Sequence, residues 1–403
     1  MSDLHINKYL SNKNELNGNV KIKSRCEDFI VKEVRGDNSI CEYKEIIDFD
    51  KFILSKEYYD NFDFNKTYNK EERKEFYGKI KYFPLYTFKV DEDKLIQTDE
   101  EDFFEFTLIK CNLNTSDAVS ILSRGIGCSF NYISFSGNKD KKAITYQDFS
   151  VKTSFKKIFS YILYLNETSS LKDQHFKSKN DLIIKSILCD ESIKDYINKN
   201  INVDFDRTEK IMISDLRRGR NIQMGSHLGN YFIIKLQNIT NFNRATNFLN
   251  YFRYQRFGKH LNNHLIGEAL LNQNYEEAIK LIKSDENDDS KVIRFINNNI
   301  SKRPKEIFRR MDRNHKMIYF HAYQSYLFNK EINELEIKEE DFNRELNLKK
   351  FNSKFLKGGK RQIIEKISNL KINETENTVE FTLNKSCYAT IALREIVQNE
   401  IYE

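Results

Sequence analysis

The stretch Phe103-Phe-Glu-Phe-Thr-Leu-Ile-Lys110, taken with Asn114-Thr-Ser-Asp117 and Ile144-Thr-Tyr-Gln-Asp-Phe-Ser-Val151, decides the fold class. Phe104, Phe106 and Leu108 alternate with polar or β-favouring residues, so residues 103–110 predict a β-strand. Residues 144–151 predict another, with Thr145, Gln147, Phe149 and Val151 on one face. Residues 114–117 are a good helix start, an apolar stripe follows, and Gly125 predicts the end of that helix. Together with the segments that follow, these elements predict an α+β protein.

Further periodicities extend this picture. Strands are predicted at residues 132–136, 231–239 and 379–383, and helices at 242–257, 315–335 and 389–399. The polar residues 137–142 join two of the strands. We therefore expect a mixed or antiparallel sheet with flanking helices.

Composition limits the class of protein. The chain has 403 residues, enough for two or three domains, with 39% hydrophobic and 31% charged residues and a formal net charge of +6. This small net positive charge is compatible with an RNA partner but does not require one. Basic clusters at residues 139–142 and 217–220 fit either solvated turns or phosphate contacts.

The cysteines and the N-terminal residues indicate the compartment. No two of the six cysteines have Cys-x-x-Cys spacing, which argues against a zinc ribbon and fits reduced thiols inside a cell. Residues 1–8 contain no signal-peptide core, and no apolar run is long enough to span a membrane. We expect a protein of the nucleus, the cytoplasm or both, without a membrane partner.

Three segments are rich in charge and poor in regular pattern. Residues 35–86 predict a charged insertion, in which 69–75 form an exposed helix face. Residues 152–205 combine Lys, Asn and Asp with apolar clusters and predict an inserted helical subdomain. Residues 284–290 predict a solvated loop.

Asp140 is the strongest candidate for chemistry. Gly137 permits an unusual turn and a close approach of a ligand, and Lys139 and Lys141 flank the carboxylate. Neighbouring cations favour an ionised carboxylate, which could act as a nucleophile or base beside a phosphate backbone. From the local sequence alone, an ordinary charged hairpin tip is the better interpretation, because charged turns are common.

Other candidate sites have less support. The chain has no phosphate-binding Gly-x-x-x-x-Gly-Lys-Ser/Thr loop and no Gly-x-Gly-x-x-Gly after a strand, so no nucleotide cofactor is indicated. His260 and His264 are four residues apart but have no third ligand, so we expect a solvent-facing pair and no metal site. The aromatic run 248–257 fits core packing or stacking on an exposed base.

Seven motifs in order resemble the TruD-type pseudouridine synthase family. The loop Phe135-Ser-Gly-Asn-Lys-Asp-Lys-Lys-Ala-Ile-Thr-Tyr-Gln147 is similar to the family's Gly-x-Lys-Asp loop and the Ala-(Val/Ile)-Thr-x-Gln that follows it. The other six lie at residues 23–34, 106–116, 225–232, 250–258, 322–329 and 388–395. The charged insertions resemble eukaryotic members more than compact bacterial ones.

The resemblance implies a fold and a domain plan. A pseudouridine synthase catalytic domain, with a mixed or antiparallel sheet and flanking helices, would comprise residues 1–34, 87–151, 206–262 and 375–403. A TRUD-type α+β insertion domain would occupy 263–374. The segments 35–86 and 152–205 would be the charged insertion and the helical subdomain.

The resemblance also implies an activity: isomerisation of a flipped-out uridine in RNA to pseudouridine, without metal or organic cofactor. Asp140 would attack the sugar C1′ or the base C6, or abstract a sugar proton. Residues expected at the substrate are, by matching position, Lys23 (paired with Asp140), Phe29 and Tyr388 (stacking), Asn250 (amide hydrogen bond), Phe252 (pocket wall) and Lys139. Core packing is the alternative for Phe29 and Phe252.

The expected substrate is tRNA at uridine thirteen of the D arm, with pre-tRNA, small nuclear RNA or mRNA sites as further options, and the expected state is a monomer. The chain departs from the family at Arg253, where glycine is usual, and at Asn384 and Ser386, where proline and glycine are usual. Two other hypotheses are a catalytically silent RNA-binding relative and a protein-interaction module that binds no RNA.

Overall fold

The computed structural model describes residues 4–11, 19–46, 48–80, 82, 86–98, 101–169, 171, 210–284, 291–349 and 358–402. Most of the predicted helical subdomain at 152–205 and of the predicted loop at 284–290 lies outside these residues. The chain divides into two compact units. One comprises Ile22–Lys235 and Thr378–Glu380, and the other comprises Met1–Lys21, Leu236–Asn377 and Phe381–Glu403.

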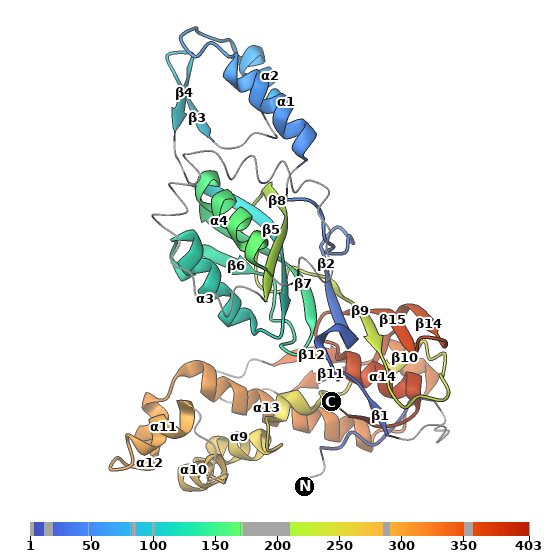
Figure 1. The fold of residues 1–403 in the computed structure, drawn as a ribbon. Coiled ribbons are helices and arrows are strands. Elements are labelled where there is room, and N and C mark those ends of the chain that lie inside the picture. Colours follow the sequence, from blue (N-terminus) through green and yellow to red (C-terminus); the bar gives the residue numbers. More distant parts are fainter. Residues whose placement is uncertain are drawn as a thin grey trace. The chain divides into compact units, whose positions relative to one another are not determined.

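The first unit is built on a sheet with the strand order β9-β2-β7-β5-β8, in which β6 also pairs with β7 (Figure 1). The strands are β2 (Phe29–Val34), β5 (Asp102–Cys111), β6 (Ile133–Phe135), β7 (Ile144–Thr153), β8 (Ile211–Arg218) and β9 (Gly229–Lys235). β2 and β7 run parallel, and the other pairs are antiparallel. The mixed sheet and the strands predicted at 103–110, 132–136 and 144–151 are confirmed.

Two helices cover one face of this sheet: α3 (Thr115–Ile126) and α4 (Phe155–Thr168). Alternate side chains of β5, namely Phe104, Phe106 and Leu108, pack with both helices in one buried cluster. Ile109 belongs to a second cluster with residues of β7 and β8, so both faces of the sheet are apolar. The helix predicted after 114–117 is confirmed, but it continues through Gly125. It ends at Gly127, whose φ of +69° is the left-handed conformation that favours glycine.

Residues 48–98 contain a small cluster of their own. It is formed by α1 (Phe49–Asp60), α2 (Lys70–Lys79) and the hairpin of β3 (Thr87–Asp91) and β4 (Lys94–Thr98). Phe76, Ile80 and Leu95 are its buried centre, ringed by partly buried aromatic side chains. The helix expected over 69–75 is confirmed, since Asn69 caps α2 by accepting hydrogen bonds from two backbone N–H groups.

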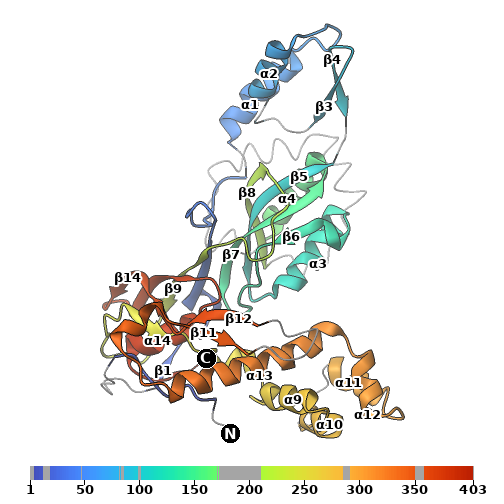
Figure 2. The same ribbon diagram turned by 180° about the vertical axis from the view of Figure 1, so that it is seen from behind.

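The second unit contains a helical part and several two-stranded pairings. In the helical part, α9 (Asn263–Leu271) packs along α13 (Arg313–Glu334), beside α10 (Tyr275–Ile282), α11 (Lys291–Asn297) and α12 (Pro304–Arg310) (Figure 2). The predicted helix at 315–335 is thus confirmed. His264 stacks on Tyr326 with ring centroids 4.6 Å apart and is buried, so the predicted solvent-facing histidine pair is wrong.

The paired strands of this unit are short. They are β1 (Val20–Lys21) with β16 (Ile401–Tyr402), β10 (Asn247–Leu249) with β13 (Ile364–Lys366), and β11 (Glu345–Leu348) with β12 (Gly359–Gln362). β14 (Ser368–Asn373) pairs with β15 (Thr378–Asn384), and α14 (Ala389–Val397) follows. The strand predicted at 379–383 and the helix predicted at 389–399 are confirmed.

The helix predicted at 242–257 is wrong. Residues 247–249 form β10, and a short 3₁₀ turn covers Tyr254–Phe257. The partner strand β13 lies more than a hundred residues further along the chain, so no local pattern signals it. Aromatic residues have only modest helix propensity, and burial of Phe248, Tyr251 and Phe257 outweighs it.

Candidate active site

The parallel pairing of β2 with β7 brings Lys23 to Asp140. Ile30 of β2 is in register with Ile144 of β7, so the segments that precede the two strands meet at one edge of the sheet. Lys23 Nζ donates a hydrogen bond of 3.1 Å to Asp140 Oδ1. The Lys23 side chain is 3% exposed and that of Asp140 is 26% exposed. The carboxylate is therefore the member of the pair that a substrate can reach.

Lys23 is held in an unusual conformation. Its φ of +55° lies in the left-handed region, which costs a non-glycine residue about 1–2 kcal/mol. The ammonium lies 4.3 Å from the ring centroid of Phe29, a cation–π contact. Phe29 is buried and meets Phe232 edge to face, with centroids 6.1 Å apart. Stacking of Phe29 on a uracil stays a prediction.

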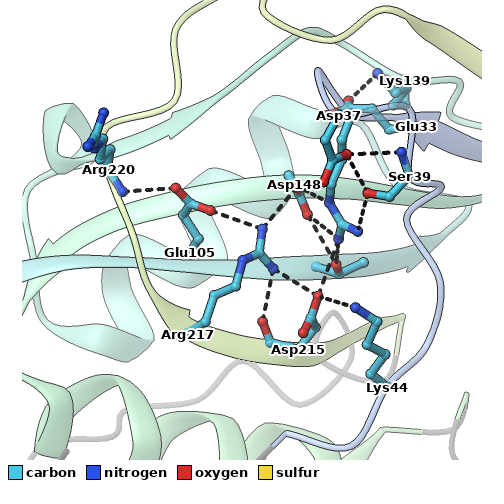
Figure 3. Close-up of polar contacts among 12 residues, drawn as sticks. Glu33, Asp37, Ser39, Lys44, Glu105, Lys139, Asp148, Asp215, Arg217 and Arg220 are labelled. Carbon is cyan, nitrogen blue, oxygen red and sulfur yellow. Dashed lines mark hydrogen bonds and ion pairs between the residues drawn. The ribbon is translucent and has the colours of Figure 1, made fainter. Parts of the chain in front are cut away.

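Lys139 points to a different partner. Its Nζ lies 2.6 Å from Oε2 of Glu33, and both side chains are almost completely buried (Figure 3). Its backbone N–H donates to Thr115 Oγ1 at 3.1 Å. Lys139 thus fixes the loop beside Asp140 through two contacts within the protein, and the expected contact of its amine with substrate stays a prediction.

Several more contacts hold the loop that carries Asp140. Gln147 Nε2 donates to the Gly137 carbonyl at 2.9 Å, and Gly225 N–H donates to the Ser136 carbonyl at 2.6 Å. A Cβ on Gly137 would lie 3.1 Å from the His227 ring, so glycine permits this close packing. The amine of Lys110 donates to the Asp140 carbonyl at 2.8 Å. The loop is consequently fixed from both ends.

Lys110 is a buried cation that the sequence analysis did not single out. It has no exposed surface, and burial lowers the pKa of its ammonium to about 8, although the negative charge of Asp140 acts in the opposite direction. At neutral pH the amine is mostly protonated. The Asp140 loop therefore lies between two buried cations, Lys23 at the carboxylate and Lys110 at the carbonyl.

Asn250, Phe252 and Tyr388 lie in the second unit, where Asn250 and Phe252 share one neighbour, Arg361, and Tyr388 contacts Phe252. Arg361 Nη2 donates to Asn250 Oδ1 at 2.6 Å, and its guanidinium lies 4.1 Å from the Phe252 ring centroid. Phe252 and Tyr388 meet edge to face with centroids 6.2 Å apart. The structure thus brings the three residues into one cluster.

The amide of Asn250 is already partly occupied. Besides accepting from Arg361, it donates from Nδ2 to the Gln362 carbonyl at 3.1 Å, and the residue is buried. One N–H and one lone pair remain for a ligand. Arg361 was missed because its neighbours in sequence, Gly-Gly-Lys-Arg-Gln, form no pattern of their own. Burial lowers the pKa of its guanidinium from the ordinary value.

Arg253 and Ser386 stand where the family usually has glycine, and their backbone conformations differ. Arg253 has an ordinary φ of −89°, so this position does not need glycine. Its Nη2 donates to the Ile401 carbonyl at 2.8 Å, and its guanidinium lies over Tyr254 at 4.2 Å. Ser386 has a φ of +69°, the conformation in which glycine costs least.

A charged network lies on the sheet of the first unit. Figure 3 shows Arg217 between Glu105, Asp148 and Asp215. Arg35 donates to Asp148 Oδ1 at 2.9 Å and to Asp215 Oδ2 at 3.4 Å. The network joins β5, β7 and β8 to the residues after β2 and so stiffens the sheet from which the Asp140 loop projects.

Within the described part of the chain, no helix is long and apolar enough to cross a membrane, and no group of His, Cys, Asp and Glu side chains could hold a metal ion.

Comparison with known proteins gives one family. The protein-family model described as tRNA pseudouridine synthase D (TruD) matches residues 63–166 and 191–303 of this chain. A protein of Nanoarchaeum equitans named "Probable tRNA pseudouridine synthase D" is 30% identical over 62% of this chain and 63% of its own length. A protein of the same name from Methanococcus vannielii is 23% identical over 98% of this chain and 99% of its own.

A mouse protein named "Pseudouridylate synthase 7 homolog" is 23% identical over 56% of this chain and 35% of its own length. The matches to the archaeal relatives from Nanoarchaeum equitans and Archaeoglobus fulgidus span 63% and 62% of those proteins. Both the Asp140 loop and Asn250 lie inside the residues that the family model matches.

Proposed function

Because this chain belongs to the tRNA pseudouridine synthase D (TruD) family, we propose that it isomerises uridine to pseudouridine in tRNA. The observation that carries the proposal is the pair of Lys23 and Asp140, in which a partly exposed carboxylate lies 3.1 Å from a buried ammonium. Such a pair holds the carboxylate in one orientation, as a nucleophile or base must be held. Uridine thirteen of the D arm is the proposed site.

The reaction rearranges bonds without an external reagent. The bond from C1′ to N1 of the uracil breaks, the base turns, and a bond from C1′ to C5 forms. N1 then carries a proton and C5 has lost one, so the mass of the RNA is unchanged. Asp140 would serve by attack on C1′ or C6 or by abstraction of a sugar proton. All three routes need a base that has left its stack, which costs a few kcal/mol.

A basic surface in the second unit supports an RNA partner. Residues 291–316 contain nine basic and two acidic residues, a net charge of +7, against +6 for the whole chain. Lys305, Arg309 and Arg310 are exposed on and at the end of α12. Residues 285–289 carry four carboxylates and lie outside the described residues. Contacts between such basic side chains and RNA phosphates would make RNA binding strongly dependent on the salt concentration.

The enzyme activity is tested with tRNA transcripts tritiated at uridine C5, because formation of the C1′–C5 bond releases that tritium. The wild type should release it, and Asp140→Asn should not. Asp60→Asn, which changes an exposed carboxylate of α1, is the control and should be fully active. In cells that lack the gene, mapping of pseudouridine at single-nucleotide resolution should show that modified sites are lost. The wild-type gene should restore these sites, and Asp140→Ala should not. Restoration of every site by Asp140→Ala would contradict the proposal.

RNA binding is tested separately. Replacing Lys305, Arg309 and Arg310 by glutamine should weaken tRNA binding and reduce the slope of log K against log salt by up to about 2–3. The matched control replaces the exposed Lys70, Lys74 and Lys79 of α2, and its slope should stay near that of the wild type. Tight tRNA binding without tritium release would instead support a catalytically silent relative. Absence of salt-dependent binding would support a module that binds no RNA.

The nuclear or cytoplasmic location and the monomeric state stay predictions. Imaging of the tagged chain and sedimentation of the purified protein test them.

A further inference from the structure

Lys110 lies where a lysine is costly. It is near the end of β5, between Thr145 of β7 and Ile211 of β8, and it has no exposed surface. It follows Phe104, Phe106 and Leu108 on the face of the sheet that α3 and α4 cover. Lysine is almost never fully buried unless it has a partner, because the ammonium loses its hydration. An apolar side chain would suit the strand better.

The partner of this ammonium is the backbone of Asp140. Lys110 Nζ donates to the Asp140 carbonyl oxygen at 2.8 Å, while Lys23 Nζ binds the carboxylate of the same residue at 3.1 Å. The two lysines come from different segments and contact opposite ends of one residue. Rotation of the Asp140 peptide would break the Lys110 contact and move the carboxylate away from Lys23.

We propose that Lys110 is a positioning residue for the reaction, which fixes the Asp140 peptide so that the carboxylate faces the substrate. The proposal rests on the proposed function for the role of Asp140, but the contact itself does not depend on that role. Lys110 touches no substrate because it has no exposed surface. Its effect must pass through the geometry and the local charge of Asp140.

Because the charge on Lys110 depends on pH, the dependence of kcat on pH tests the proposal. The titratable groups that act on it are Asp140, Lys139, Cys111 and Cys26. Burial lowers its pKa to about 8, the negative charge of Asp140 raises the pKa, and the positive charge of Lys139 lowers it. A cation whose pKa is lowered carries its charge below that value and loses it above. Positioning by the charged amine therefore weakens as the pH rises through about 8.

Lys110→Met separates positioning from packing. Methionine fills a similar volume without charge. It removes the desolvation cost of the buried ammonium, but it leaves the Asp140 carbonyl without this donor. Because these two effects oppose each other, we expect a small change in melting temperature. We also expect a fall in kcat of about 10- to 100-fold and an unchanged KM, since small displacements of reacting groups cost this much. The alkaline limb of the kcat profile near pH 8 should disappear. Lys110→Gln, which keeps one N–H donor without the charge, should retain more activity and also lack that limb.

Asn166→Leu is the matched control for instability. Asn166 is buried in the same unit and exchanges two hydrogen bonds with the backbone of Ile213, which pairs with Leu108 and not with Lys110. This variant should lower the melting temperature and leave kcat and the alkaline limb unchanged. If Lys110→Met lowers kcat only in proportion to the folded fraction, or keeps the alkaline limb, Lys110 is not a positioning residue.

Hydrogen exchange in the absence of RNA tests the contact without reference to activity. Peptides covering residues 136–143 should exchange at least several-fold faster in Lys110→Met than in the wild type, and no faster in Asn166→Leu. Faster exchange with an inactive wild type would reject the proposed function and leave the structural contact standing. Unchanged exchange in a folded Lys110→Met protein would overturn the positioning role whether or not the enzyme is active.

Discussion

Asp148→Asn tests the charged network that underlies the candidate active site. Asp148 accepts hydrogen bonds from Arg35 at 2.9 Å, Thr107 at 3.1 Å and Arg217 at 3.2 Å, and its side chain is 9% exposed. Burial by itself would raise the pKa of this carboxyl, but the hydrogen bond from Arg35 and the charges of Arg217 and Arg35 outweigh burial and lower it. Asparagine keeps the shape and removes the charge.

The expected loss in the free energy of unfolding depends on which ion pairs remain after Asp148 is replaced. Removing one member of a buried ion pair costs about 3–5 kcal/mol, because a charge is left without its partner. Arg35 would keep Asp215 at 3.4 Å, and Arg217 would keep Asp215 at 2.8 Å and Glu105 at 3.0 Å. The loss should therefore lie at the lower end of that range, about 3 kcal/mol.

Urea denaturation at a series of pH values measures this loss. The stability that a lowered carboxyl pKa contributes is complete above the unfolded value of about 4 and is lost as the pH falls through the folded value. The gap between the wild type and Asp148→Asn should thus be constant above about pH 5 and narrow below about pH 4. As a control, Asp60→Asn breaks a pair with Lys56 that is half exposed and should cost under about 0.5 kcal/mol.

A cost below about 1 kcal/mol for Asp148→Asn at pH 7, or a gap that stays constant down to pH 3, would refute this reasoning. Either result would mean that water, rather than Asp148, solvates the two guanidinium groups. The double variant Asp148→Asn with Arg35→Met should recover part of the loss, since the second change removes a charge that has lost its closest partner.

Three further substitutions have predictable effects on the urea midpoint. Ser386→Gly should stabilise by about 1 kcal/mol, because serine occupies a left-handed conformation there, and an unchanged midpoint would contradict the strain. Gly125→Ala should cost about 1–3 kcal/mol, because its Cβ would lie 2.0 Å from the ring of the buried Tyr161; a neutral effect would mean that this ring can move. Asn69→Ala removes the cap of α2 and should cost about 1 kcal/mol, and retention of full stability would show that the cap is dispensable.

Local pattern predicts the central sheet well because its strands have strong alternation. Phe104, Phe106 and Leu108 recur at every second position, and they also pack in one cluster, so local and tertiary preferences agree. Residues 247–249 are different. Their strand exists because a partner at 364–366 pairs with them, and that pairing leaves no signature near residue 248. Elements held by distant partners are therefore where pattern fails.

In the candidate site, too, some residues could be predicted from sequence motifs and others could not. Matching of motifs identified Lys23 and Asp140, and the structure brings these two together across 117 positions of sequence. Arg361 and Lys110 were missed, because each acts through a contact with a distant backbone carbonyl or amide that composition cannot reveal. Glu33 was also missed, although an acidic residue within a buried strand is a signal that a basic partner lies nearby.

Lys23, Lys139 and Lys141 show why proximity in sequence to Asp140 does not identify the ionic partner of its carboxylate. Lys139 is next to Asp140 in sequence but pairs with Glu33, and Lys141 is exposed. A partner for Asp140 must then come from the neighbouring strand, and the parallel register of β2 with β7 makes the segment before Phe29 the one that can supply it. The strand pairing of the sheet, more than the charge of the loop, therefore determines which cation holds the candidate catalytic carboxylate.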